Sequence, residues 1–260
     1  MKRLVGTELK SYFKNPNSVT SWWKPEEGSY RFWHDQEFKI LDKYLDVGKG
    51  WLVWDAACGQ ARFARYYAKR GCRVHALDIN TEMLKIARER AGREGVLDRI
   101  QFFEGDVETF AGGNTEFDVV TCMDALDHMD DLHLAIKNLV RPLKKGGRFI
   151  ITYTSTESVY GFLRDLYTLF AYRHRDQEVD IGKSYTYIEV KEALKHADIE
   201  IEHIFGIGLI MAPQERMRFP LFINKFFEFL SRLDIALKPY HANNWLASRC
   251  SGVMIIGKRG

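Results

Sequence analysis

Cysteine and proline are scarce in this chain, with 4 and 6 among its 260 residues. The cysteines stand singly, without a C-x-x-C pair, which argues against a zinc finger or a disulfide framework. The N-terminus MKRLVGTELK lacks the apolar segment of a signal peptide. The longest apolar run, 204–213, is too short and too interrupted by glycine to span a bilayer. We therefore expect a cytoplasmic protein with reduced cysteines.

The chain also lacks a strong excess of either charge. Its formal net charge is +3 and its pI about 8.5, which is too mild to indicate a nucleic-acid binder. Apolar residues make up 46% and charged residues 28%, so disordered and collagen-like classes are excluded. A chain of this length can bury a full hydrophobic core, and we expect one domain with elaborations.

Short apolar segments alternate with helical patterns from Gly50 onward. The predicted strands are 51–54, 73–77, 100–103, 117–122, 148–153, 199–205 and 252–257. The predicted helices are 35–45, 60–70, 80–93, 131–140 and 188–196, with Asn80 or Thr81 as the cap of the third. This alternation predicts a mostly parallel sheet with helices on both faces. The first 50 residues carry no clear strand.

Three acids follow three consecutive predicted strands. Asp55 opens the segment DAACGQARF, Asp78 ends the second strand, and Asp106 follows the third. The small residues after Asp55 let backbone N–H groups approach a ligand at the positive end of a helix. Asp78 is placed to accept hydrogen bonds from ribose hydroxyls. Because ligands of open α/β sheets bind at the carboxyl ends of the strands, these acids indicate a ligand site.

The turn after Asp55 lacks the two common nucleotide-binding signatures. It keeps only Gly59 of a G-x-G-x-x-G pattern, and it has no P-loop lysine. Together with Asp78 and the pair 105–106, the turn is similar to the class I S-adenosylmethionine (SAM) methyltransferase family. The resemblance covers about 51–154 and, more loosely, 188–205. It implies a Rossmann-like, doubly wound sheet of seven mostly parallel strands, with the last strand antiparallel and SAM as cofactor, leaving S-adenosyl-L-homocysteine as product.

The resemblance also implies a role for individual residues at the methionine and ribose end of SAM. Asp55 would lie near the SAM amino group. The backbone of Ala57, Cys58 and Gly59 would hold the methionine and ribose, and Asp78 would bind the ribose hydroxyls. The family's turn usually reads D-x-G-x-G-x-G, so alanine replaces two of its glycines here, Ala57 among them.

At the other end of the cofactor, the resemblance implies that Ile79 and Met83 border the adenine. Asp106 would bind its N6 amino group, and Val107 would lie at the ring edge. Met123 would line the transferred methyl group.

His128 matches the second histidine of a loop that often reads L-H-H-L in this family. It is the candidate general base, which is needed only when the acceptor is an alcohol or phenol that is protonated at neutral pH. A packing or capping role for His128 remains an alternative.

Four acids near His128 raise the question of a metal ion, as in catechol-type methyltransferases: Asp124, Asp127, Asp130 and Asp131. We interpret them as the solvated start of a helix, where acids complement the helix dipole, and we expect no metal.

Two aromatic-rich stretches, 160–180 and 213–245, interrupt the pattern. We expect one methyltransferase domain with an N-terminal helical cap (1–49), a SAM-binding core (50–154) and two lids on the acceptor side (155–187 and 209–248). The helical pattern over 221–237 is apolar on most of its surface. It fits three uses, which are packing on the core, covering an apolar acceptor, or contacting a membrane or a second subunit.

The predicted function is methyl transfer from SAM to an O or N atom of a small, largely apolar acceptor. A first alternative is an RNA or DNA methyltransferase. The chain lacks N-P-P-[YF] after the fourth strand, where it reads MDAL, and it lacks a basic RNA-binding appendage, so we expect no nucleic-acid partner. A second alternative is a SAM-binding regulatory protein, against which the three strand-end acids argue.

Overall fold

The computed structural model describes residues 2–20, 28–110, 116–158, 179–180, 182–209, 229 and 246–260. Most of both expected lids, including all of the 221–237 pattern except Phe229, therefore lies outside the described residues.

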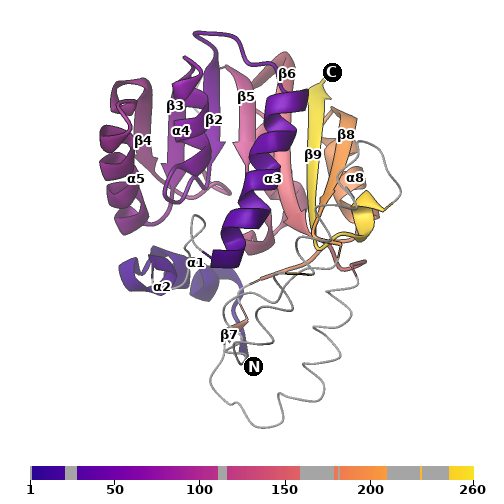
Figure 1. Cartoon of the computed structure of the whole chain (residues 1–260). Helices are drawn as coiled ribbons and strands as arrows, with labels where there is room; N and C mark the ends of the chain where they lie inside the picture. Colours follow the sequence, from indigo (N-terminus) through magenta and orange to yellow (C-terminus); the bar gives the residue numbers. More distant parts are fainter. Residues whose placement is uncertain are drawn as a thin grey trace.

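Seven strands form one sheet in the order β4-β3-β2-β5-β6-β9-β8 (Figure 1). Their bounds are β2 (Leu52–Ala56), β3 (Arg73–Asp78), β4 (Ile100–Glu104), β5 (Phe117–Cys122), β6 (Leu143–Thr154), β8 (Ile199–Ile207) and β9 (Gly252–Arg259). Strand β9 is antiparallel to both of its neighbours, and the remaining pairs are parallel. The predicted sheet, with its last strand antiparallel, is confirmed.

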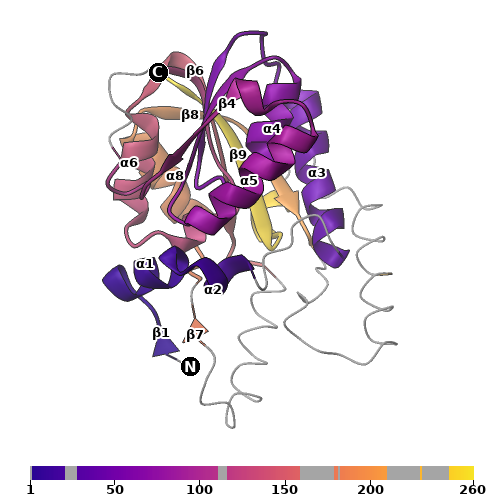
Figure 2. The same cartoon turned by 90° about the vertical axis from the view of Figure 1, so that its left-hand side faces the viewer.

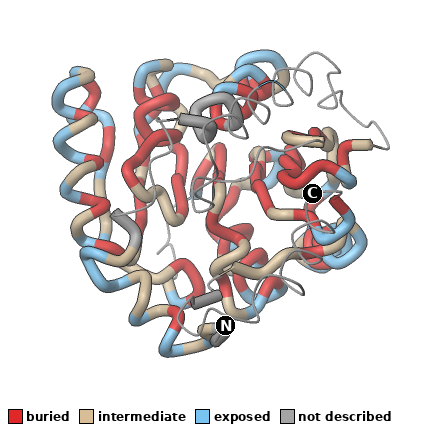
Figure 3. Tube along the Cα trace, turned by 60° about the horizontal axis from the view of Figure 1, so that its bottom comes forward, coloured by how far each residue is buried: buried red, intermediate tan, exposed pale blue. Residues whose placement is uncertain are grey.

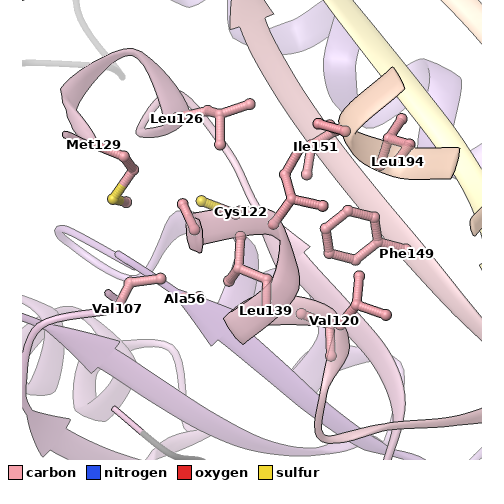
Figure 4. Packing of buried hydrophobic residues seen from close by; sticks show 14 of the residues in the cluster. Ala56, Val107, Val120, Cys122, Leu126, Met129, Leu139, Phe149, Ile151 and Leu194 are labelled. Carbon is pink, nitrogen blue, oxygen red and sulfur yellow. The ribbon is translucent and has the colours of Figure 1, made fainter. Parts of the chain in front are cut away.

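Helices cover both faces of this sheet, as predicted (Figure 2). Their bounds are α3 (Gly28–Tyr44), α4 (Arg62–Lys69), α5 (Thr81–Arg93), α6 (Leu132–Val140) and α8 (Tyr187–His196). Side chains alternate between the faces, so Val53 packs with α3, α4 and α5 whereas Trp54 packs with α6 and α8. These contacts form two hydrophobic clusters, one on each face of the sheet. Figure 4 shows the cluster that contains Trp54, where Phe149 and Ile151 of β6 lie near Leu139 and Leu194.

Burial follows the same layering, and exposed residues gather on the outer turns of the helices (Figure 3). Each fully buried large apolar side chain contributes about 1.5–3 kcal/mol of transfer free energy. The two clusters therefore fix the strands, and with them the positions of the loops that follow the strands.

Side-chain caps begin α5 and α8, and of these the cap at Asn80 is the one that the sequence predicts. The Asn80 side chain accepts hydrogen bonds from the N–H groups of Glu82 and Met83 at 3.0 and 3.1 Å and begins α5. Thr186 and Glu189 form a capping box at the start of α8.

The N-terminal segment forms a cap at the carboxyl ends of β2 to β5, built from α1 (Gly6–Lys14) and α2 (Pro16–Thr20) (Figures 1 and 2). Asn80 Nδ2 donates to the Phe13 carbonyl at 2.7 Å, and the Gly6 N–H donates to Asp130 Oδ1 at 2.7 Å. The sequence shows no clear strand in the first 50 residues, but the structure has one short strand there. The two-residue strand β1 (Lys2–Arg3) pairs in parallel with β7 (Val179–Asp180), a pairing too short and too distant in sequence to leave a periodic pattern.

Three further findings bear on the sequence predictions. The expected loop after α6 belongs to β6, whose register against β5 shifts between Phe117 and Val119, and Gly146 takes a φ of +74° there. None of the four cysteines, all of which lie in the described part of the chain, forms a disulfide. Within the described ranges, no helix is long and apolar enough to cross a membrane.

Candidate active site

The turn after β2 keeps a glycine-like backbone although alanine occupies two of its positions. Ala57, Gly59 and Ala61 have φ values of +57°, +53° and +58°. A left-handed conformation costs about 1–2 kcal/mol for a residue with a Cβ atom, and alanine has the smallest side chain that carries one. The Cys58 N–H donates to the Leu77 carbonyl at 2.8 Å, which ties the turn to β3.

Asp55 lies under this turn at the carboxyl end of β2. Its side chain is buried, and Oδ2 accepts a hydrogen bond from the Ala64 N–H at 2.8 Å in the first turn of α4. Burial raises the pKa of Asp55 to about 7, against the lowering effects of the Ala64 hydrogen bond and the Arg62 charge. A positive ligand group near this carboxyl would favour its ionised form.

Asp78 connects the turn to the end of β3. Its Oδ2 accepts from the Gly59 N–H at 2.7 Å and its Oδ1 from the Asn80 N–H at 2.9 Å. Burial raises the pKa of Asp78 above its ordinary value, in spite of these backbone hydrogen bonds. Each carboxylate oxygen has a second lone pair, so Asp78 can also accept from two vicinal hydroxyls.

Asp106 lies beyond β4, beside the N-terminal cap. Its Oδ1 accepts from the Glu108 N–H at 2.9 Å, and its Oδ2 pairs with Lys10 Nζ of α1 at 2.7 Å. A Cβ atom at the preceding Gly105 would lie 2.9 Å from Leu77 Cδ1, so a side chain there would require Leu77 to shift. Sequence reasoning missed Lys10, because nothing local links it to a residue almost a hundred positions away.

The remaining predicted cofactor residues lie at the same edge of the sheet. Met83 and Val107 are buried, Ile79 is half-buried, and Met123 is buried directly after β5. The strands pair in the order β4-β3-β2-β5, so the structure brings their carboxyl ends together. Three features of this edge fit an adenosyl ligand. They are a turn whose backbone a ligand can approach closely, a buried carboxyl group that can accept from two vicinal hydroxyls, and an acid beside apolar side chains.

His128 lies in a short 3₁₀ turn (Leu126–His128) and is half-buried. Its ring centroid is 4.7 Å from that of Phe13, with the planes tilted by 42°. This contact joins the loop after β5 to the N-terminal cap. It fits the packing alternative, and the catalytic role stays a prediction.

The interpretation of the four neighbouring acids is correct only for Asp131, which caps α6 by accepting from the Leu134 N–H at 3.0 Å. Asp127 accepts from the Thr154 N–H at 2.9 Å, and the Asp124 N–H donates to Thr152 Oγ1 at 2.7 Å. Asp130 binds Gly6 of α1, as described above. Three of the acids therefore tie the loop to β6 and to the cap, contacts that sequence spacing does not show.

A buried charge cluster lies beside this loop, formed by His34 and Glu37 of α3, Arg62 of α4, and Asp124. Arg62 Nη2 lies 2.8 Å from Glu37 Oε2 and 2.9 Å from Asp124 Oδ2. His34 Nδ1 lies 2.9 Å from Glu37 Oε2. Sequence reasoning missed His34, Glu37 and Arg62, although Arg62 belongs to the DAACGQARF segment. The missing information was tertiary, since α3 contributes two of the members.

The electrostatics of this cluster are set by burial. Burial raises the pKa of Glu37, which is fully buried, against the lowering effect of Arg62. It also raises the pKa of Asp124 to about 6, with the Glu37 charge acting in the same direction. The ligand atoms of His34, Glu37 and Asp124 lie within 4.8 Å of one another, a spacing that can hold a metal ion. The guanidinium of Arg62 already contacts both carboxylates, and the absence of a metal stays a prediction.

The charge cluster borders a pocket where β5, β6 and β8 end and β9 begins. It is lined by Glu37, Asp124, Asp127, Thr152, Tyr153, Thr154, Ile207 and Gly252. Because Met123 immediately precedes Asp124, this pocket lies next to the strand end that the sequence assigned to the methyl group.

Comparisons with known proteins agree with this geometry. The methyltransferase-domain family matches residues 54–151. A ubiquinone/menaquinone biosynthesis C-methyltransferase of Bradyrhizobium sp. is 33% identical over 151 residues, covering 56% of this chain and 58% of its own length. A ubiquinone biosynthesis O-methyltransferase of Actinobacillus pleuropneumoniae is 30% identical over 169 residues, covering 62% of this chain and 70% of its own.

The fold is shared with solved methyltransferase structures. The magnesium protoporphyrin IX methyltransferase of Synechocystis PCC 6803, solved with bound S-adenosyl-L-homocysteine, aligns with a TM-score of 0.66 at 16% identity and covers 97% of this chain and 98% of that one. The chain spans 58% of the length of the first curated relatives it matches. From its fold and these relatives, the chain belongs to the class I SAM-dependent methyltransferase family, and SAM is its cofactor.

Proposed function

We propose that this chain transfers a methyl group from SAM to an O or N atom of a small, largely apolar acceptor. The pocket beside Met123 carries the proposal. Its carboxylates and threonines accept hydrogen bonds, so it suits an acceptor that presents an O–H or N–H group. The named relatives methylate in small-molecule biosynthesis, which supports this class of acceptor rather than RNA, DNA or a regulatory partner.

We propose the cofactor roles that the sequence predicted, at the positions just described. Asp55 faces the amino group, the backbone of 57–59 holds methionine and ribose, and Asp78 accepts from the ribose hydroxyls. Ile79, Met83, Asp106 and Val107 contact the adenine, and Met123 lines the methyl. When bound, SAM supplies an electrophilic methyl group on a sulfonium. The chain aligns this group with the acceptor and excludes water, and alignment alone can lower a barrier by about 7–11 kcal/mol.

The N-terminal cap supports this arrangement from the solvent side. Lys10 reaches both Asp106 and Glu108, so α1 covers the proposed adenine end of the site. We propose that 1–49 is the cap, 50–154 the cofactor core, and 155–187 and 209–248 the acceptor lids, in a cytoplasmic protein. Contact with a lipid-like acceptor, a membrane surface or a second subunit belongs to the same proposal, because these lids are rich in aromatic residues.

The proposal is tested by measuring which molecules of a cell extract receive the methyl group. The purified chain is incubated with methyl-labelled SAM and the separated small-molecule, RNA and protein fractions of an extract. We expect label in small molecules that partition into organic solvent, and carbon-13 shifts typical of O-methyl or N-methyl groups. Label in RNA or protein would contradict the proposal. A C-methyl shift would contradict its choice of atom and favour the chemistry named for the Bradyrhizobium relative.

A further inference from the structure

One carboxylate atom and one guanidinium atom of the charge cluster remain without a hydrogen-bond partner within the described residues. They are Glu37 Oε1 and Arg62 Nη1, and both are buried. Glu37 is fully buried and lines the pocket. A buried acceptor of this kind costs free energy unless a ligand satisfies it, so Glu37 Oε1 points to a hydrogen-bond donor in the pocket.

The charged side chains around the pocket indicate which charge the ligand's donor group carries. Three carboxyl groups line the pocket, those of Glu37, Asp124 and Asp127. The groups that face Asp124 are His34 and Glu37 from α3, Arg62 from α4 and Thr152 from β6. Arg62 is shared between two of the carboxylates, and Asp127 is held by Thr154. Three carboxyl groups therefore face one guanidinium and one imidazole on this side, so a positive group would be stabilised there when the carboxyl groups are ionised.

Amine and hydroxyl acceptors behave in opposite ways next to such charges. A phenol or alcohol becomes a better nucleophile as its oxygen becomes negative, which neighbouring carboxylates oppose. An amine nitrogen becomes positive as it forms the new bond, which the same carboxylates favour.

We propose that Glu37 and Asp124 bind the amino nitrogen of an amine acceptor, and that Asp124 takes the proton this nitrogen loses. The inference rests on the proposed function and narrows its acceptor to the amines. The nitrogen lone pair forms the N–C bond while the C–S bond breaks, and the C–S electron pair stays on sulfur. The methylated nitrogen then passes one proton to the Asp124 carboxylate, which releases it to water.

The backbone at Asp124 gives a clean way to test this assignment. Asp124 has a φ of +55°, a conformation that asparagine also adopts readily. Asp124→Asn therefore removes the charge while keeping the shape and the turn. Glu37→Gln provides a second variant at the other carboxyl. Asp131→Asn is the matched control, because it changes an acid of the same loop and asparagine also caps helices.

The probes are benzylamine, benzyl alcohol and benzoate, which share a skeleton and differ in charge. Their affinities are measured by calorimetry on the full chain saturated with S-adenosyl-L-homocysteine. We expect wild type and Asp131→Asn to bind benzylamine at least tenfold more tightly than the other two. Asp124→Asn and Glu37→Gln should reduce this preference at least fivefold, with the affinity for S-adenosyl-L-homocysteine unchanged within twofold.

The outcomes separate the inference from the function on which it rests. Equal binding of the three probes by wild type, or an undiminished preference in both variants, would overturn the amine site and leave methyl transfer to small apolar acceptors standing. Binding of none of the probes to the cofactor-saturated chain would overturn both.

Discussion

Two edges of the same site are built in different ways. At the proposed cofactor edge, where β2, β3 and β4 end, Asp55 and Asp78 accept hydrogen bonds from backbone N–H groups in the turns after β2 and β3 and in the first turn of α4. At the acceptor edge, where β5 and β6 end, Asp124 contacts side chains from two distant helices, α3 and α4. The proposed cofactor edge is thus held by backbone hydrogen bonds close to the strand ends, whereas the proposed acceptor edge depends on contacts between side chains of distant helices.

A mutation that breaks a contact at the proposed acceptor edge should cause a large loss in the free energy of unfolding. Arg62→Ala leaves Glu37 and Asp124 without the guanidinium that contacts both, and breaking a buried pair in this way costs about 3–5 kcal/mol. Chemical denaturation measures the loss in the free energy of unfolding. Arg93→Ala is the control, since its contact with Glu89 is exposed and should cost less than about 1 kcal/mol. Equal effects of the two changes would show that the charge cluster contributes no more to stability than an exposed ion pair.

The cofactor edge should respond in ligand affinity. Asp78→Ala removes the proposed acceptor of the ribose hydroxyls and the anchor of the Gly59 N–H. Losing a charged acceptor costs about 1.5–3 kcal/mol, so the SAM affinity should fall about tenfold to more than a hundredfold. Calorimetry on this variant and on Asp98→Ala, an exposed acid, gives the comparison. An unchanged SAM affinity would show that Asp78 does not bind the cofactor.

Acid should weaken SAM binding through Asp55. Its pKa of about 7 leaves it mostly protonated below that pH, while the positive cofactor favours the ionised form. Affinity should therefore drop as the pH falls from 7 to 5.5, by up to about tenfold per pH unit. Stability of the free protein should change in the opposite direction. Because the folded pKa is raised, this contribution is present below the unfolded value of 3.8 and is lost as the pH rises through about 7.

Asp55→Asn is the matched variant, since its amide oxygen can still accept from the Ala64 N–H. We expect it to remove both pH dependences. If calorimetry shows the same pH profile in this variant, the dependence belongs to another group.

The smallest effect concerns the alanines of the turn. Ala61→Gly relieves a left-handed residue, whereas Ala68→Gly weakens the interior of α4. Unfolding free energies should show Ala61→Gly to be less destabilising by about 1 kcal/mol. The opposite order would mean that the turn is not strained.

The sequence predicts the ends of β2, β3 and β4 well because their determinants are local. Alternating apolar segments give the strands, and an acid after each strand is visible without tertiary information. Asn80 shows the same principle, since a cap is defined by residues two and three positions away.

The acceptor edge could not be predicted to the same extent. Glu37 and Arg62 meet only because α3 and α4 pack on the same face of the sheet, and the sequence gives no distance between them. The four acids after β5 look like a helix start, yet only Asp131 caps a helix. Which acid binds a helix and which binds a neighbouring strand depends on the path of the loop, and that path is fixed by β6.

Amide hydrogen exchange with and without SAM tests the separation of the two edges most directly. The account predicts that SAM protects the amides of 57–64, 78–83 and 105–108, and that it leaves 152–154 and 252–254 nearly unchanged. Protection centred on 152–154, with none in the turn after β2, would contradict the account, because SAM would then occupy the pocket assigned to the acceptor.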